Sequence, residues 1–123
     1  MKLPTSGKEV LTAMLDHYKK VGAKGWTKGH AYKTDKAGRM KACCLSGCAA
    51  LVTGISIYAD SGVNGQQFSK LAKLREKAAA RFVKYVGKEF IDFNDSRNRT
   101  FKQIKNALAA AIVGTPYNTR RAA

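Results

Sequence analysis

Residues 65–86 read GQQFSKLAKLREKAAARFVKYV and predict the longest helix of the chain. Apolar side chains recur every three or four residues, which is the period of a helical face packed on a core. Basic side chains recur at the same steps along a second face, and at 1.5 Å per residue that face extends for about 27 Å. The apolar positions are Phe68, Leu71, Leu74, Ala78, Phe82 and Tyr85 or Val86.

Two further helices have sequence signals at both ends. Ser6-Gly7-Lys8-Glu9 forms a capping box before an apolar period that starts at Val10, and Gly22 is a suitable stop. Thr100-Phe101-Lys102-Gln103 forms a second capping box, and Gly114 with Pro116 ends that helix. The inward positions are Val10, Leu11, Met14, Tyr18 and Val21 in the first helix, and Phe101, Ile104, Leu108 and Ile112 in the second.

The middle of the chain changes character. Residues 25–42 alternate around an Asp35-Lys36-Ala37-Gly38 turn, which predicts a short β-hairpin. Residues 43–57 carry no charge and predict a buried central helix that approaches its neighbours closely through Gly47 and Ala49. Asp60-Ser61-Gly62 is expected as a loop, Asn64 as a helix cap, and Phe90–Phe93 as an extended segment or loop that inserts its aromatic rings into the core.

These elements predict an α+β fold, mainly α, with about four helices and one short β-hairpin. We expect a single globular domain over residues 1–114 and a basic tail over residues 115–123. The expected core contains Trp26, Cys44, Leu51, Leu71, Phe82, Phe90, Phe93, Phe101, Ile104 and Leu108.

The charge of the chain is the strongest indication of function. Its 123 residues include 23 Lys and Arg against 8 Asp and Glu, a formal net charge of +15. Residues 43–63 carry only Asp60, and residues 89–95 carry three acids and no base, so the cations occupy all the other stretches. Self-repulsion on this scale favours an anionic partner.

The cations predict a surface for nucleic acid, because phosphates bind to positive side chains spaced along one face. Tyr117 beside the terminal arginines is a candidate for stacking on a base. The alternative is a face that lysines merely keep solvated. No helix-turn-helix, zinc-finger or aromatic RNA-binding signature indicates sequence-specific binding. The candidate residues are Lys70, Lys73, Lys77, Arg81, Lys84, Lys88, Arg97, Arg99, Lys102, Lys105, Arg120 and Arg121.

The three cysteines allow two kinds of chemistry. Cys43, Cys44, Cys48 and His30 lack the spacing of known zinc modules, so we expect no metal and no cofactor. Cys43 or Cys44 at a helix N-terminus, with His30 and Asn94 or Asp95, would assemble a cysteine nucleophile. The competing interpretation is that the cysteines are small core residues.

The pair Asn94-Asp95 is expected to make local turn hydrogen bonds before the helix cap at Thr100. Asp95 lies among Arg97, Arg99 and Lys102 in the sequence, which predicts an ion pair that fixes this loop.

Several of these residues also form a pattern. Gly25-Trp26-x-x-Gly29, a hairpin ending in Gly38-Arg39, Cys44-x-x-Gly47-x-Ala49 and Phe93-Asn94-Asp95-x-x-x-Arg99-Thr100 together resemble a family of short proteins of unknown function from actinobacteria, other bacteria and their phages. The resemblance covers residues 8–113 and implies a compact helical fold with a small hairpin, but no activity. Phe93 stands where the family has Trp, Ser46-Gly47-Cys48 replaces a simpler run of small residues, and this chain is more basic.

We therefore expect a small, basic, non-catalytic protein, phage-encoded, that binds nucleic acid without sequence specificity. One alternative is a virion component or host-factor binder whose basic surface contacts an acidic protein, and a second is a cysteine-dependent enzyme. The start Met1-Lys2-Leu3-Pro4 does not resemble a signal peptide and the odd cysteine count suggests reduced thiols, so we expect a cytoplasmic or virion location with no membrane partner.

Overall fold

The computed structural model describes residues 4–54 and 65–117, with side chains from residue 69 onward in the second range. Within these residues the fold is α+β and mainly helical, as the sequence predicts. The predictions at Asp60–Gly62, Asn64, Phe68, Arg120 and Arg121 lie outside the described residues. The elements are α1 (Gly7–Val21), a 3-10 turn η1 (Ala23–Gly25), β1 (Tyr32–Thr34), β2 (Met40–Cys43), α2 (Leu45–Val52), α3 (Gly65–Val86), α4 (Phe90–Asn94) and α5 (Phe101–Val113).

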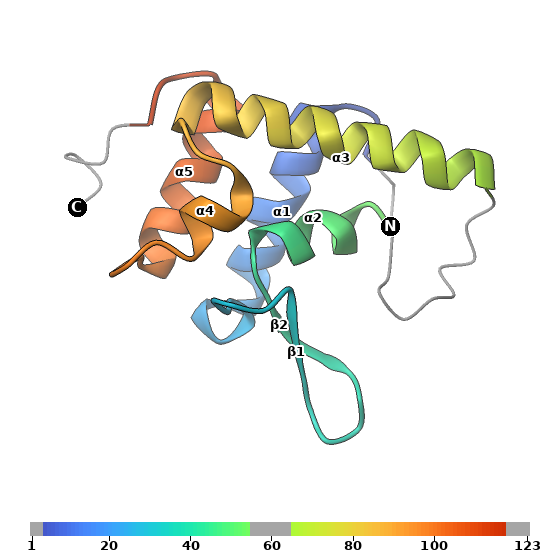
Figure 1. Cartoon of the computed structure of the whole chain (residues 1–123), viewed down its shortest axis with the longest axis vertical. Coiled ribbons are helices and arrows are strands. Elements are labelled where there is room, and N and C mark those ends of the chain that lie inside the picture. The colour runs from blue at the N-terminus through green and yellow to red at the C-terminus, as the bar shows by residue number, and fades with distance from the viewer. Residues whose placement is uncertain (1–3, 55–64, 118–123) are drawn as a thin grey trace.

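The helix α3 lies across one end of α1 and α5, and the hairpin projects from the opposite side of the molecule (Figure 1). The hairpin is antiparallel, with Tyr32 opposite Cys43 and Lys33 opposite Ala42, and its turn places Gly38 at a φ of 78°. No helix among the described residues is both long enough and apolar enough to cross a membrane.

The core lies where α1, α3 and α5 meet. Its largest fully buried side chains include Tyr18 from α1, Phe82 from α3 and Ile104 from α5. Seven of the ten expected core residues are buried, whereas Trp26, Leu51 and Phe101 are half-buried. The rings of Trp26 and Phe101 pack against the core from its edge and against each other.

The helix starts follow the sequence signals. The Thr100 hydroxyl accepts from the Gln103 amide at 3.2 Å, and the Gln103 side chain accepts from the Thr100 amide at 3.1 Å, so the second capping box is complete. At α1 only half of the box forms. The Ser6 hydroxyl accepts from the Glu9 amide, whereas the Glu9 carboxylate accepts from the hydroxyls of Thr5 and Ser6.

Two predicted elements were wrong in extent or type. The buried helix is shorter than residues 43–57, because Cys43 belongs to β2, Cys44 is the N-cap of α2, and Thr53 caps its end. Phe90–Phe93 is helical in α4, not extended. Successive strand side chains alternate between faces, so an extended segment would turn Phe90 and Phe93 to opposite sides. In the helical turn both rings lie against Phe82, with centroids 4.8 and 5.6 Å away, and both are buried as expected.

Gly47 explains how β1 and α2 pack so closely. A Cβ at this position would lie 2.1 Å from the Ala31 carbonyl oxygen, which accepts from the Cys44 amide at 3.1 Å. The predicted close approach at Gly47 is therefore confirmed, and any side chain there would force β1 away from α2.

The chain remains packed on the domain beyond residue 114. The Tyr117 amide donates to the Tyr85 carbonyl at 2.7 Å, and the Tyr117 ring stands edge-on to Phe93 with centroids 5.5 Å apart. The ring proposed for base stacking is thus half-buried against α4.

Candidate nucleic-acid interface

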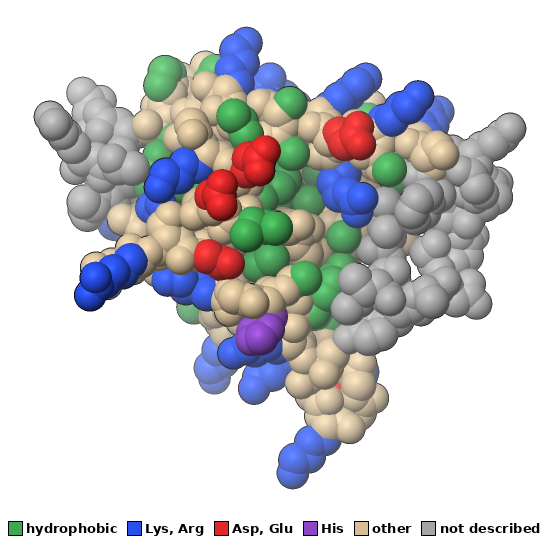
Figure 2. Space-filling model, viewed as in Figure 1, with side chains coloured by type: hydrophobic (Ala, Val, Ile, Leu, Met, Phe, Trp, Pro, Cys, Tyr) green, Lys and Arg blue, Asp and Glu red, His purple; other side chains and the backbone are tan. Residues whose placement is uncertain are grey.

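The basic stripe of α3 is exposed but interrupted. Lys70, Lys73, Lys77, Lys84 and Lys88 are all exposed. Figure 2 shows basic side chains along the outer edge of the molecule over this helix. Arg81, which falls between Lys77 and Lys84 in the predicted stripe, is half-buried. Without it, Lys77 and Lys84 are separated by about 10 Å along the helix axis.

Arg81 is held in a structural contact. Its Nε donates to the Ala111 carbonyl at 2.7 Å and its Nη2 to the Ile112 carbonyl at 3.1 Å, while its guanidinium carbon lies 5.2 Å from the Tyr85 ring centre. Carbonyls of the last helical turn have no partner within their own helix. Arg81 therefore caps the end of α5 and joins it to α3.

The second predicted cluster also divides into free and engaged cations. Arg97 and Lys102 are exposed. The Arg99 guanidinium lies over the Phe93 ring at 3.6 Å, and its Nε donates to the Phe93 carbonyl at 2.8 Å. Lys105 is half-buried, with its Nζ 5.0 Å from the Phe101 ring centre. Arg99 thus fixes the turn before α5 and has little surface left for a ligand.

The two clusters do not merge into one surface. Arg81 binds the last carbonyls of α5, whereas Lys102 stands in the first turn of that helix. The nine residues from Lys102 to Ala111 correspond to about 14 Å along the axis. The α3 stripe and the cations before α5 therefore lie at different ends of α5.

The sequence reasoning missed a third basic region beside the hairpin. Lys24, Lys33 and Lys41 line a hollow of about 520 Å³ together with Trp26, Thr27 and Ala42. The three lysines come from η1, β1 and β2, and the pairing of β1 with β2 brings Lys33 and Lys41 together. Their spacing along the chain therefore did not indicate a shared site. Cations around an aromatic ring are a combination that binds nucleic-acid strands.

Among the described residues, almost none of these cations forms an ion pair. Within residues 4–54 and 65–117 the single ion pair joins Arg39 to Asp35 at 3.4 Å, in the hairpin turn. The exposed lysines of α3, the exposed cations before α5 and the hollow's three lysines therefore have no carboxylate partner in the described structure.

Asn94 is the most connected polar side chain of the fold. It is fully buried, and its Oδ1 accepts from Trp26 Nε1 at 2.7 Å and from the Leu45 amide at 3.1 Å. Its Nδ2 donates to the Thr27 carbonyl at 3.0 Å and to Asp95 Oδ1 at 2.9 Å. The role is structural, as favoured from the sequence, but three of its four bonds reach distant segments and are not local turn contacts.

Asp95 extends this network and makes no ion pair with another described residue. Its Oδ1 accepts from the Gly29 amide at 2.9 Å, and the hydrogen bonds from Asn94 and Gly29 lower the pKa of Asp95. The expected ion pair with Arg97, Arg99 or Lys102 was wrong. The loop is held instead by hydrogen bonds to backbone atoms, which include the one that Lys28 Nζ donates to the Ser96 carbonyl at 2.9 Å.

The structure does not assemble the cysteine site suggested by the sequence. Cys43, Cys44 and Cys48 are all buried, His30 is exposed, and Asn94 is committed to the network described above. Among the described residues, no group of three or more His, Cys, Asp or Glu is arranged to hold a metal ion.

His17, and not His30, is the histidine near a thiol. The pKa of Cys43 is lowered by a hydrogen bond from Cys48 and then by His17, with burial opposing both, while burial raises the pKa of Cys48. Burial also raises the pKa of Cys44, whose Sγ accepts from the Gly47 amide at 3.4 Å. Cys43 is 0% exposed, so its thiol has no access to a substrate in this conformation.

Together these features define a small helical domain with one hairpin, held by a buried asparagine network and covered by unpaired cations. The chain belongs to the family of unknown function DUF6197, whose sequence model matches residues 4–113. No curated protein and no solved structure matches the chain.

Proposed function

We propose that this protein is a non-catalytic nucleic-acid-binding protein that contacts the phosphate backbone without reading sequence. The observation that carries the proposal is the surplus of exposed cations with no ion-pair partner in the described residues. Binding to a polyanion would relieve the self-repulsion of a domain at +15 and release the counterions of the polyanion. With this function we also propose a phage origin and a location in the host cytoplasm.

The interface we propose is centred on Lys70, Lys73, Lys77, Lys84 and Lys88, because these side chains are exposed along one helix face. Arg97 and Lys102, and separately the hollow of Lys24, Lys33 and Lys41, would offer further phosphate contacts on other sides. Arg81 and Arg99 are left out of the contact set, because their guanidinium groups are bound to backbone carbonyls.

The test is the salt dependence of binding to two unrelated duplexes of about 20 base pairs, followed by fluorescence anisotropy. We expect equal affinities for the two sequences and a steep fall in affinity with salt. A triple variant Lys70→Gln/Lys73→Gln/Lys77→Gln should reduce the slope of log K against log salt by up to about 2.7, since each phosphate contact contributes about 0.9.

A matched control variant distinguishes the effect of the α3 stripe from the effect of net charge. Lys8→Gln/Lys19→Gln/Lys20→Gln removes the same charge from exposed positions of α1 and should change the slope much less. An equal loss in both triple variants would refute the α3 stripe as the interface. Wild-type affinity that does not respond to salt would refute nucleic-acid binding itself and favour an acidic protein partner.

A further inference from the structure

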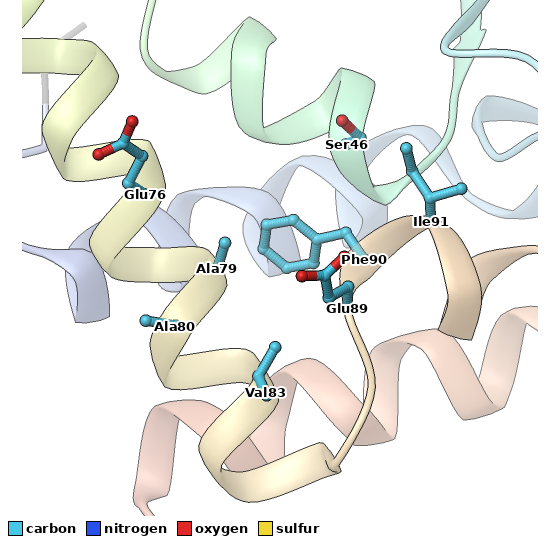
Figure 3. A pocket seen from close by; sticks show the side chains of 8 residues that line it. All are labelled: Ser46, Glu76, Ala79, Ala80, Val83, Glu89, Phe90 and Ile91. Atoms are coloured by element: carbon cyan, nitrogen blue, oxygen red, sulfur yellow. The ribbon is translucent and has the colours of Figure 1, made fainter.

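One groove on this basic protein is apolar and rimmed by acids. It lies between α3, α4 and the first turn of α2, with a volume of about 420 Å³ (Figure 3). Its apolar wall includes Val83, 37% exposed, and Ile91, 57% exposed, which are among the most exposed large hydrophobic residues described. The full lining is Ser46, Glu76, Ala79, Ala80, Val83, Glu89, Phe90 and Ile91.

The sign of the charge reverses around this groove. Among the described residues that line it, Glu76 and Glu89 are the charged ones, and the exposed Asp92 follows Ile91 in the chain. None of these three carboxylates forms an ion pair with another described residue. Figure 2 shows acidic side chains gathered around an apolar patch over α3 and α4. Such a groove repels phosphate and complements a segment that carries an apolar side chain among cations.

The same chain presents such a segment at the end of α1. Val21 is 40% exposed, and Lys19, Lys20 and Lys24 around it are all exposed. A Cβ on Gly25 would lie 2.1 Å from the Val21 side chain, so the absence of a side chain at Gly25 lets the valine pack on its backbone. Val113, at the end of α5, is more exposed, at 72%, and is the other candidate for the groove. The cation at that end of α5 is Arg81, however, and its guanidinium is already hydrogen-bonded to α5 carbonyls.

We propose that the groove binds the Val21 end of a second copy of this chain. The two surfaces are separate, and the α3 wall of the groove lies near the start of α1, far from Val21. Gly7 at the start of α1 packs on α3 at Lys77 and Ala78, and Val21 lies about 21 Å further along α1. Each contact is head-to-tail, so an assembly of any length retains one unoccupied groove at one end and one unoccupied Val21 end at the other. The protein therefore assembles into open chains, and the small contact makes each step weak.

The experiment is sedimentation velocity on nuclease-treated protein at about 0.15 M salt, where repulsion between distant charges is screened. The groove variant is Glu76→Lys/Glu89→Lys, and the α1 variant is Lys19→Glu/Lys20→Glu. We expect the sedimentation coefficient of the wild type to rise with concentration and each variant alone to remain monomeric. An equimolar mixture of the two variants should associate again, because the first variant retains its α1 end, the second retains its groove, and the two reversed surfaces are again opposite in charge.

Two controls distinguish the loss of this contact from a general effect of net charge. Ile91→Gln leaves the charge unchanged and should abolish self-association. Lys8→Glu/Lys36→Glu matches the charge of the α1 variant at exposed positions away from Val21, and should associate like the wild type. Circular dichroism verifies that each variant is folded. A wild type that stays monomeric over about a hundredfold range of concentration overturns the proposal. So does a mixture of the two variants that remains monomeric, or a groove variant that still associates.

Discussion

Replacing Asn94 with Ala should destabilise the fold more than any other single polar substitution in it. The side chain makes four hydrogen bonds, and three of their partners lie in segments 49 to 68 residues away: the Trp26 indole, the Leu45 amide and the Thr27 carbonyl. The substitution removes a side chain that joins the segment after η1, the start of α2 and the end of α4.

The magnitude follows from the partners left behind. The bonds to the Leu45 amide and the Thr27 carbonyl are buried, and the bond to Trp26 is partly buried. A buried polar group that loses its partner costs about 1–3 kcal/mol, so the two fully buried groups cost about 2–6 kcal/mol, and the indole, which water can reach, adds less. The fourth partner, Asp95, is exposed and can bond to water. With a total stability of about 5–15 kcal/mol for a domain, this loss would bring the protein close to unfolding.

The assay is urea unfolding, followed by the fluorescence of Trp26, the single tryptophan of the chain. Asn106→Ala is the matched control, because Asn106 is exposed on α5 and should change the free energy of unfolding by less than about 0.5 kcal/mol. Trp26→Phe removes the indole donor together with part of the ring that packs on Phe101, leaves Asn94 bonded to Leu45, and should cost at least about 1 kcal/mol by circular dichroism. If Asn94→Ala costs no more than Asn106→Ala, the network does not hold the fold together.

Three other substitutions test the roles assigned to single charges. Because its hydrogen bonds hold the pKa of Asp95 below the unfolded value, its stabilising effect is present above about pH 4 and lost as the pH falls through the folded pKa. Asp95→Asn should therefore lose less stability than the wild type on acidification, and an unchanged acid transition in urea titrations would contradict this role. Arg81→Lys should lower the free energy of unfolding by about 1–2 kcal/mol by breaking the fork to the α5 carbonyls. Lys77→Ala should leave stability within about 0.5 kcal/mol and reduce the salt slope of nucleic-acid binding by about 1. The reverse pattern in urea unfolding and anisotropy would show that the two cations had been assigned the wrong roles.

Helices and turns were predictable where the signal is local. The serine and threonine caps, the glycine stops and the apolar periods of α1, α3 and α5 lie within a few residues of what they determine. The short α4 was not predictable in this way. Four residues fit an extended segment or a helical turn equally well, and the choice is made by Phe82, which both Phe90 and Phe93 must reach.

The candidate site was only partly predictable, because spacing along a helix identifies a face but not the contacts of each side chain. Arg81 fits the periodicity of the basic stripe, yet its guanidinium meets α5 carbonyls that lie 30 and 31 residues away in the chain. Lys33 and Lys41 gave no signal, since only the hairpin register brings them to one hollow. His17 was missed as the neighbour of Cys43 because the two residues lie on different elements.

The residues that carry the family resemblance and the residues proposed to bind nucleic acid occupy separate parts of the structure. Trp26, Gly29, Asn94 and Asp95 form one connected hydrogen-bond network, and Arg99 is stacked on Phe93 in the same region. None of the exposed α3 lysines takes part in that network. The resemblance pattern is therefore accounted for by folding, and a nucleic-acid-binding role cannot be transferred through it. A chain that retains these motif residues but replaces the α3 lysines would keep this fold and lose the proposed activity, so the function of each such protein has to be judged from its own surface charge.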